Sequence, residues 1–230
     1  MNGPDASADI GALRELLERR FRTTQSVLLV GERRLSLLHP ESADDLIDEA
    51  EFERDERLPY WADIWPSARV LASHIAQMDG AGRSLLELGC GAGLVATAAA
   101  LAGFRVCATD YYEDALRFTE VNVAEHTGQV PETRLVDWRA LPTDLGRFDV
   151  VVGSDVLYER AYGRLVARAM DMTLTGAGEA VIADPGRIAA EEFTRDAAER
   201  GLRLVAREPV AFVDGAIRQT ITLYHLRRGA

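Results

Sequence analysis

Three glycines at alternate positions form the strongest candidate for a ligand loop in this 230-residue chain. Gly89, Gly91 and Gly93 lie in the run E-L-G-C-G-A-G-L, which follows the apolar segment 84–88. Glycine between a strand and a helix permits a tight turn and lets a ligand approach the backbone closely. The run therefore predicts a nucleotide-type site at the end of a strand.

Acidic residues near this loop distinguish two classes of ligand. Dinucleotide-binding enzymes carry G-x-G-x-x-G, but here Leu94 stands at the position of the third glycine. Asp110, at the end of the next apolar segment, suits a ribose diol in either class. Glu87 does discriminate, because a carboxylate there would crowd a pyrophosphate. It suits a ligand with an ammonium group and no phosphate, such as S-adenosylmethionine (SAM).

Two further groups of candidate residues follow later apolar segments. Asp137 can accept a hydrogen bond from an adenine amino group, and the indole of Trp138 can pack against the ring. The run S-D-V-L-Y, residues 154–158, follows the segment 148–153. A buried acid in such a place is costly unless it is paired. This cost marks Asp155 as a candidate for the reaction itself.

The elements that must position these residues alternate between strand and helix patterns. We expect strands at 84–88, 104–109, 133–136, 148–153, 179–183, 202–207 and 217–226, and helices at 92–101, 113–126, 162–174 and 188–200. Such alternation predicts an α/β fold, a doubly wound, Rossmann-like and mostly parallel sheet with helices on both faces. Ligands bind these sheets at the carboxyl ends of strands, where the candidates above are placed.

The N-terminal part has a different pattern. Apolar spacing predicts a helix within 9–22, and the strands 27–30 and 35–38 form a hairpin. The aromatic segment 58–68 leads into a helix from Pro66 to Gly80, because a proline in the first helical turn loses no hydrogen bond. We therefore divide the chain into an N-terminal extension, residues 1–57, and a main domain, residues 58–230.

Composition excludes several classes of partner. The net charge is −11 and no basic stripe is visible, which argues against nucleic acid. Segment 41–56 holds nine acids and one arginine, and is either a solvated face or a negatively charged surface that attracts a cationic substrate.

No apolar run is long enough to span a membrane. Two cysteines predict a cytoplasmic setting, and scattered histidines predict no metal site. We expect a monomer or weak dimer.

From Leu58 onward the chain resembles the class I, seven-stranded, SAM-dependent methyltransferases, whose last strand is antiparallel. The run D-V-L-Y, residues 155–158, resembles the acid-x-x-Tyr motif of their protein-lysine methyltransferase branch, and P-Y-W-A-D-I-W-P, residues 59–66, its aromatic entry segment. The run A-D-P-G-R, residues 183–187, resembles the electron-transfer-flavoprotein β-subunit lysine methyltransferases and their bacterial relatives. Ser67-Ala68 stands where those relatives tend to have two glycines, which argues against that particular substrate.

The resemblance implies SAM as cofactor, a protein lysine as substrate, and a role for each candidate residue. Asp155 and Tyr158 would be the catalytic residues that face the incoming amine. The cofactor would be bound by Trp65, Glu87, Gly89, Cys90, Gly91, Gly93, Asp110, Tyr111, Asp137, Trp138 and Ser154. A small-molecule amine N-methyltransferase and a non-catalytic cofactor-binding scaffold stay as alternatives. Glu87 and Leu94 disfavour a nicotinamide oxidoreductase.

Overall fold

A computed structural model describes residues 6–43, 46 and 59–229. Its larger sheet has seven strands in the order β5-β4-β3-β6-β7-β9-β8. The first five are parallel, and β9 runs antiparallel to both of its neighbours. The predicted Rossmann-like sheet with an antiparallel last strand is therefore confirmed. The strands are β3 Ser84–Leu88, β4 Arg105–Asp110, β5 Glu132–Leu135, β6 Phe148–Ser154, β7 Leu174–Asp184, β8 Leu202–Asp214 and β9 Ile217–Arg228.

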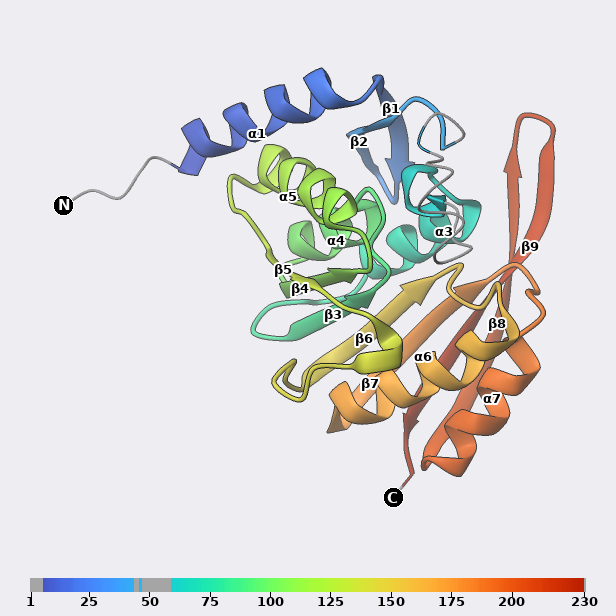
Figure 1. Cartoon of the computed structure of the whole chain (residues 1–230). Helices are drawn as coiled ribbons and strands as arrows, with labels where there is room; N and C mark the ends of the chain where they lie inside the picture. The colour runs from blue at the N-terminus through green and yellow to red at the C-terminus, as the bar shows by residue number, and fades with distance from the viewer. Residues whose placement is uncertain (1–5, 44–45, 47–58, 230) are drawn as a thin grey trace.

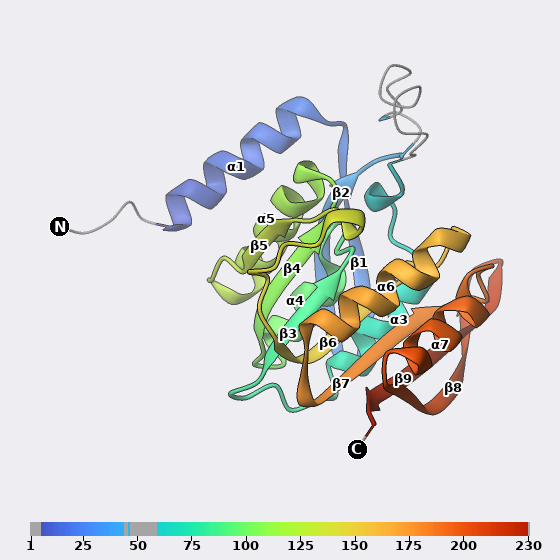
Figure 2. The ribbon, with the colours of Figure 1, turned by 60° about the horizontal axis from the view of Figure 1, so that its bottom comes forward.

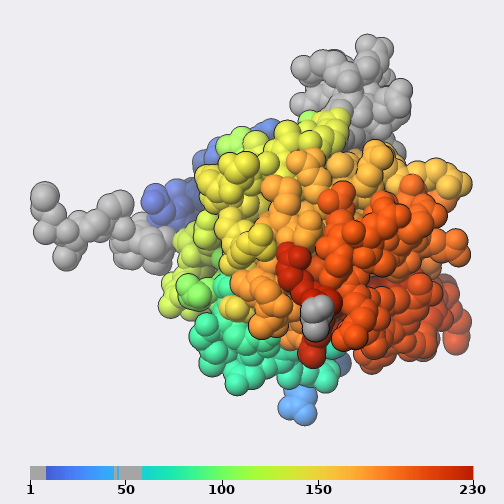
Figure 3. Space-filling view, turned by 90° about the horizontal axis from the view of Figure 1, so that it is seen from below, coloured from blue at the N-terminus to red at the C-terminus, as the bar shows by residue number. Residues whose placement is uncertain are grey.

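Helices cover both faces of this sheet (Figures 1 and 2). Alternate strand residues point to opposite faces, so Leu85 packs in one core with α3, α4 and α5, and Leu86 in a second core with α6 and α7. Seen from below, the atoms of α6 and α7 form a continuous surface beside the C-terminal end (Figure 3). No helix among the described residues is long and apolar enough to cross a membrane. The helices are α3 Pro66–Ile75, α4 Leu94–Leu101, α5 Glu113–Thr127, α6 Arg160–Thr173 and α7 Ala190–Glu199.

Several predicted boundaries were wrong by four residues or more: β7 begins at Leu174 instead of residue 179, and the first strand of the N-terminal hairpin begins at Thr23 instead of residue 27. Helix α3 ends at Ile75, short of Gly80, because the chain must turn there into β3: Gly80 N donates to the Ala102 carbonyl, and Asp79 Oδ1 accepts from Ala81 N. Strand β8 continues far beyond the predicted 202–207 and forms a long hairpin with β9 (Figure 1). Glu208 and Pro209 interrupt the run after residue 207, and a proline inside a run argues against a continuous strand when the sequence alone is read.

The predicted N-terminal helix and hairpin are present as α1 Ala6–Arg20, β1 Thr23–Val30 and β2 Arg33–Pro40. The Asn122 side chain, on α5, accepts from Leu38 N and donates to the Leu38 carbonyl, so β2 is bonded to the main body. Most of the acidic segment 41–56 lies outside the described residues. The division of the chain between residues 57 and 58 stays a prediction.

Close packing explains why the third loop glycine cannot carry a side chain. Gly93 has φ +85°, and a Cβ there would lie 2.7 Å from both the Cα and the Oγ1 of Thr119 on α5. We expect Gly93→Ala to lower the free energy of unfolding by about 2–4 kcal/mol, from the positive φ and overpacking together. Urea denaturation measures this change.

Gly128→Ala is the matched control, because Gly128 also has a positive φ, +73°, but its Cβ would meet nothing within 4 Å. It should cost only about 1 kcal/mol, the left-handed conformation alone. Equal losses in the two variants would mean that contact with Thr119 is not what requires glycine at position 93.

Candidate active site

A cavity of about 380 Å³ opens at the carboxyl ends of β3, β4 and β6. This volume is within the range of small-molecule sites, and chain order reverses between β3 and β6, where doubly wound sheets bind ligands. The structure brings all but one of the predicted site residues to this cavity; Gly93 alone does not line it. Those that line it are Trp65, Glu87, Gly89, Cys90, Gly91, Asp110, Tyr111, Asp137, Trp138, Ser154, Asp155 and Tyr158.

The glycine loop is held in place by the neighbouring strand β4. Gly89 N and Cys90 N both donate to the Thr109 carbonyl, and Gly91 N donates to Asp110 Oδ2 at 2.9 Å. Gly89 and Gly91 have positive φ values, and a Cβ at Gly91 would lie 3.0 Å from the Trp61 carbonyl oxygen. The absence of side chains therefore lets the aromatic segment approach the loop closely.

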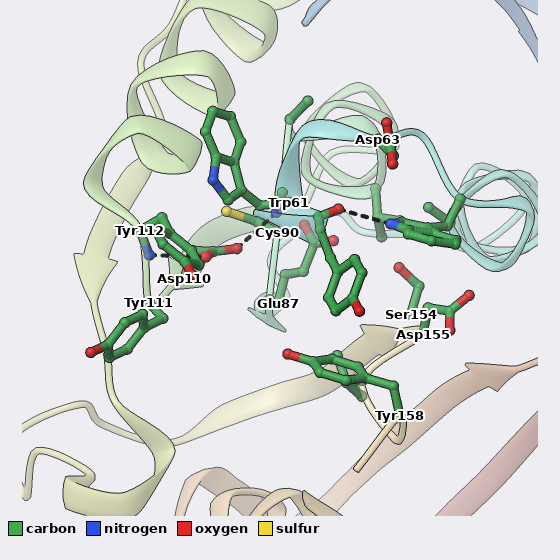
Figure 4. Close-up of a pocket in the computed structure, with 18 of the residues that line it drawn as sticks. Trp61, Asp63, Glu87, Cys90, Asp110, Tyr111, Tyr112, Ser154, Asp155 and Tyr158 are labelled. Carbon is green, nitrogen blue, oxygen red and sulfur yellow. Dashed lines mark hydrogen bonds between the residues drawn. The ribbon is translucent and has the colours of Figure 1, made fainter. Parts of the chain in front are cut away.

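Asp110 and Asp155 lie on opposite sides of the cavity, with Glu87 between them (Figure 4). Asp110 is buried, and besides Gly91 N it accepts from Tyr112 N at 3.1 Å. Burial raises the pKa of Asp110, and the backbone hydrogen bonds oppose that rise. Each oxygen accepts one backbone hydrogen bond in this way, which fixes the carboxylate and leaves lone pairs for a ligand hydroxyl.

Glu87 is a buried carboxyl with an unsatisfied oxygen. It is 1% exposed, and its Oε2 has no hydrogen-bond partner among the described residues. Burial, and then the nearby Asp110, raise the pKa of Glu87 well above its ordinary value. A buried polar atom without a partner is costly, so this oxygen fits a ligand that brings a donor or a positive charge.

This raised pKa predicts a pH-dependent stability. A carboxyl whose pKa is higher in the folded state destabilises the fold as pH rises from about 4.5 through the folded pKa. We expect the cofactor-free Glu87→Gln variant to be more thermostable than the unsubstituted protein near about pH 8, and to lose that advantage near about pH 4. Thermal unfolding across this range measures the difference.

The control for this prediction is Glu113→Gln, at an exposed position where Glu113 pairs with Arg117. The Glu113→Gln variant should show no comparable increase in thermal stability at alkaline pH. A stability difference for Glu87→Gln that stays constant between the two pH values would contradict a raised pKa as its cause.

Asp155 is the only non-glycine residue with a positive φ, +56°, in the part of the chain that the structure describes. Its Oδ1 accepts from Arg187 Nε at 2.6 Å, and its Oδ2 accepts from Ser67 Oγ at 3.1 Å. Its backbone N–H donates to the Ala183 carbonyl at 2.9 Å. Backbone strain of this kind is concentrated at functional sites, and here three hydrogen bonds hold the strained residue at the end of β6.

Aromatic rings form much of the remaining wall. Tyr158 makes edge contacts with Tyr60 and Tyr162, at centroid distances of 5.5 and 4.9 Å. Burial, and then Tyr162, raise the pKa of Tyr158, so its hydroxyl stays protonated at neutral pH. Trp65 Nε1 donates to the Tyr60 carbonyl at 2.8 Å. Trp138 lies beside the glycine loop, because a Cβ at Gly89 would be 3.5 Å from its ring.

Several lining residues were not singled out from the sequence. Tyr112, Tyr162 and Leu37 carry no local motif that would reveal them, whereas Tyr60 belongs to the aromatic segment 59–66 but was not named by itself. Arg187 belongs to the A-D-P-G-R run, yet the sequence did not indicate that its guanidinium would reach Asp155. Arg187 follows shortly after the predicted strand 179–183, and this position at a strand end was the signal that could have indicated a site residue.

Comparison with solved structures places the fold among class I methyltransferases. The magnesium protoporphyrin IX methyltransferase ChlM of Synechocystis PCC 6803, solved with bound SAM, superposes with a TM-score of 0.59 at 16% identity. The match covers 80% of this chain and 94% of that one. Identity at this level supports the shared fold alone.

Residues 49–193 match the model of the lysine methyltransferase family, and the chain belongs to this family. It is 32% identical over 116 residues to the protein-lysine methyltransferase METTL21E of Mus musculus, covering 45% of this chain and 47% of that protein. It is 31% identical over 138 residues to the electron transfer flavoprotein beta subunit lysine methyltransferase of Danio rerio, covering 58% and 53%. The chain thus spans about half the length of these curated relatives.

Proposed function

We propose that this protein is a SAM-dependent N-methyltransferase that acts on lysine side chains of another protein. The observation that carries the proposal is a single cavity that holds an unsatisfied Glu87 carboxyl on one strand end and a strained, hydrogen-bonded Asp155 on another. The first is suited to a cofactor with an ammonium group, and the second to a substrate amine. Membership of the lysine methyltransferase family supports this assignment.

The residues on the β3–β4 side fit the cofactor. Glu87 would accept from its ammonium group, Asp110 from the ribose hydroxyls, and Trp138 would pack on adenine with Asp137 near the amino group. When bound, SAM supplies a methyl group on a positively charged sulfur. Further contacts would come from Trp65, Gly89, Cys90, Gly91, Tyr111 and Ser154, which line the cavity. Gly93 was predicted with them but packs against Thr119 on α5.

The residues on the β6 side would prepare the amine. A lysine amine has a pKa of about 10.4 in water, so it must lose a proton to solvent before it can react. Its lone pair would then accept the methyl group that bound SAM supplies, and the sulfur would leave as a neutral thioether that keeps the electron pair. Asp155 and Tyr158 would orient the neutral amine in line with that bond, and positioning of this kind supplies roughly 7–11 kcal/mol of a barrier.

A labelling experiment tests the proposal. The purified protein is incubated with methyl-labelled SAM and a cell lysate, and labelled bands are hydrolysed to identify methyllysine. The chain contains no lysine, so methyllysine must come from another protein. Label only in small solutes would favour a small-molecule amine as substrate, and SAM binding without transfer would favour a non-catalytic scaffold. The cytoplasmic location and the monomeric or weakly dimeric state stay predictions.

A further inference from the structure

The carboxylate proposed to meet the substrate amine already has a cationic partner. Arg187 Nε lies 2.6 Å from Asp155 Oδ1, and the two side chains are 36% and 7% exposed. Both residues line the cavity, and the guanidinium is the more exposed partner of the pair. It also lies over the Trp65 ring, 5.5 Å from the centroid, within the range of a cation–π contact.

The backbone around Arg187 is built to hold this position. Asp184, the last residue of β7, is fully buried, and its Oδ1 accepts from Gly186 N at 2.8 Å and Arg187 N at 2.7 Å. Gly186 adopts a φ of +96°, which closes the turn. The ion pair thus joins the ends of β6 and β7 with the entry to α3, where Trp65 lies.

Electrostatics gives this pair a consequence for the reaction. A carboxylate without a partner stabilises a nearby ammonium and raises its pKa, so it would bind lysine with the proton that blocks transfer. A carboxylate paired with a guanidinium carries a compensated charge but keeps lone pairs that accept from an amine N–H. The paired form orients the amine without favouring its protonated state.

We propose that Arg187 is a positioning residue that compensates the charge of Asp155, so that the site accepts the substrate amine in its neutral form. This inference rests on the proposed function. It assigns to the A-D-P-G-R turn a role in setting the protonation state of the substrate, besides any contribution to the fold.

Other charged groups around the cavity would be common to all variants of Arg187. Asp137 and Arg139 pair with each other on η3, Trp138–Ala140. The remaining titratable groups that line the cavity or contact Arg187 are Tyr60, Asp63, Glu87, Cys90, Asp110, Tyr111, Tyr112, Tyr158, Glu159, Tyr162 and Asp184. A difference between variants at position 187 therefore reports on the guanidinium.

The pH dependence of labelling tests the inference. Arg187→Met and Arg187→Gln remove the charge, and Arg187→Lys keeps it. Over the alkaline range, with lysate protein at concentrations that saturate the labelling rate, we expect the pH of half-maximal rate to rise by about one unit in the uncharged variants, a tenfold rate loss near neutrality. Arg187→Lys should restore most of the original profile. A lower rate with an unshifted profile would overturn the inference and indicate a structural role.

Binding of n-butylamine, a mimic of the lysine side chain, provides a readout without turnover. Calorimetry in buffers of different ionisation enthalpy counts the protons released on binding to the protein saturated with S-adenosylhomocysteine. We expect the unsubstituted protein to release a proton and the uncharged variants to release fewer while binding about tenfold more tightly. Equal proton release would overturn the inference. Proton release as expected, without any labelling of lysate protein, would instead count against the proposed function.

Discussion

Replacing Asp155 by asparagine should lower the rate of methyl transfer by at least about a hundredfold while the affinity for SAM stays within a few-fold. The change keeps the size of the side chain, and asparagine tolerates the positive φ of this position. It replaces a carboxylate whose two oxygens accept from Arg187 and Ser67 by an amide with only one oxygen. The substrate amine therefore loses the fixed carboxylate that would accept its hydrogen bond. Initial rates of labelling and calorimetric titration with SAM measure the two quantities.

The matched control is Asp144→Asn, since Asp144 is exposed and pairs with Arg134 away from the cavity. It should leave both quantities unchanged. Thermal unfolding of each variant separates a lost catalytic contact from a loosened fold. A folded Asp155→Asn protein that still transfers methyl groups at the original rate would reject Asp155 as a catalytic residue.

Replacing Asp110 by asparagine should weaken SAM binding by about 10- to 100-fold, because hydrogen bonds to a charged group are worth about 1.5–3 kcal/mol. One amide oxygen can replace only part of the carboxylate, which now accepts from Gly91 N and Tyr112 N and would also accept from a ribose diol. Titration calorimetry gives the dissociation constant directly.

The free energy of unfolding of the same variant should stay unchanged or increase. Burial raises the pKa of Asp110, so the fold disfavours its charged form, and asparagine removes that charge. Glu113→Gln, at an exposed position three residues further along the chain, serves as the control and should bind SAM normally. Unchanged affinity in Asp110→Asn would remove Asp110 from the cofactor site.

Local sequence patterns were sufficient for the main architecture. The strand β3 was predicted with its observed bounds, and Asp110 was expected at the end of the next strand. Both predictions succeeded because the end of a short apolar strand can be recognised from the glycine or acid that follows it in the chain. Since parallel strands end at one edge of a sheet, this was also enough to predict that Glu87, Asp110 and Asp155 would share a site. All three line one cavity.

Contacts between distant segments were decided by the tertiary structure. The partners of Asp155 are 32 and 88 residues away in the chain, on the turn after β7 and on α3. Apolar periodicity records which face of an element is buried, but it contains no information about which side chains from different elements meet. The sequence alone determined the sheet, the glycine loop and the acids at the strand ends. Only the packing of β6, β7 and α3 around one edge placed Arg187 against Asp155, because that pairing depends on strand order and turn geometry together.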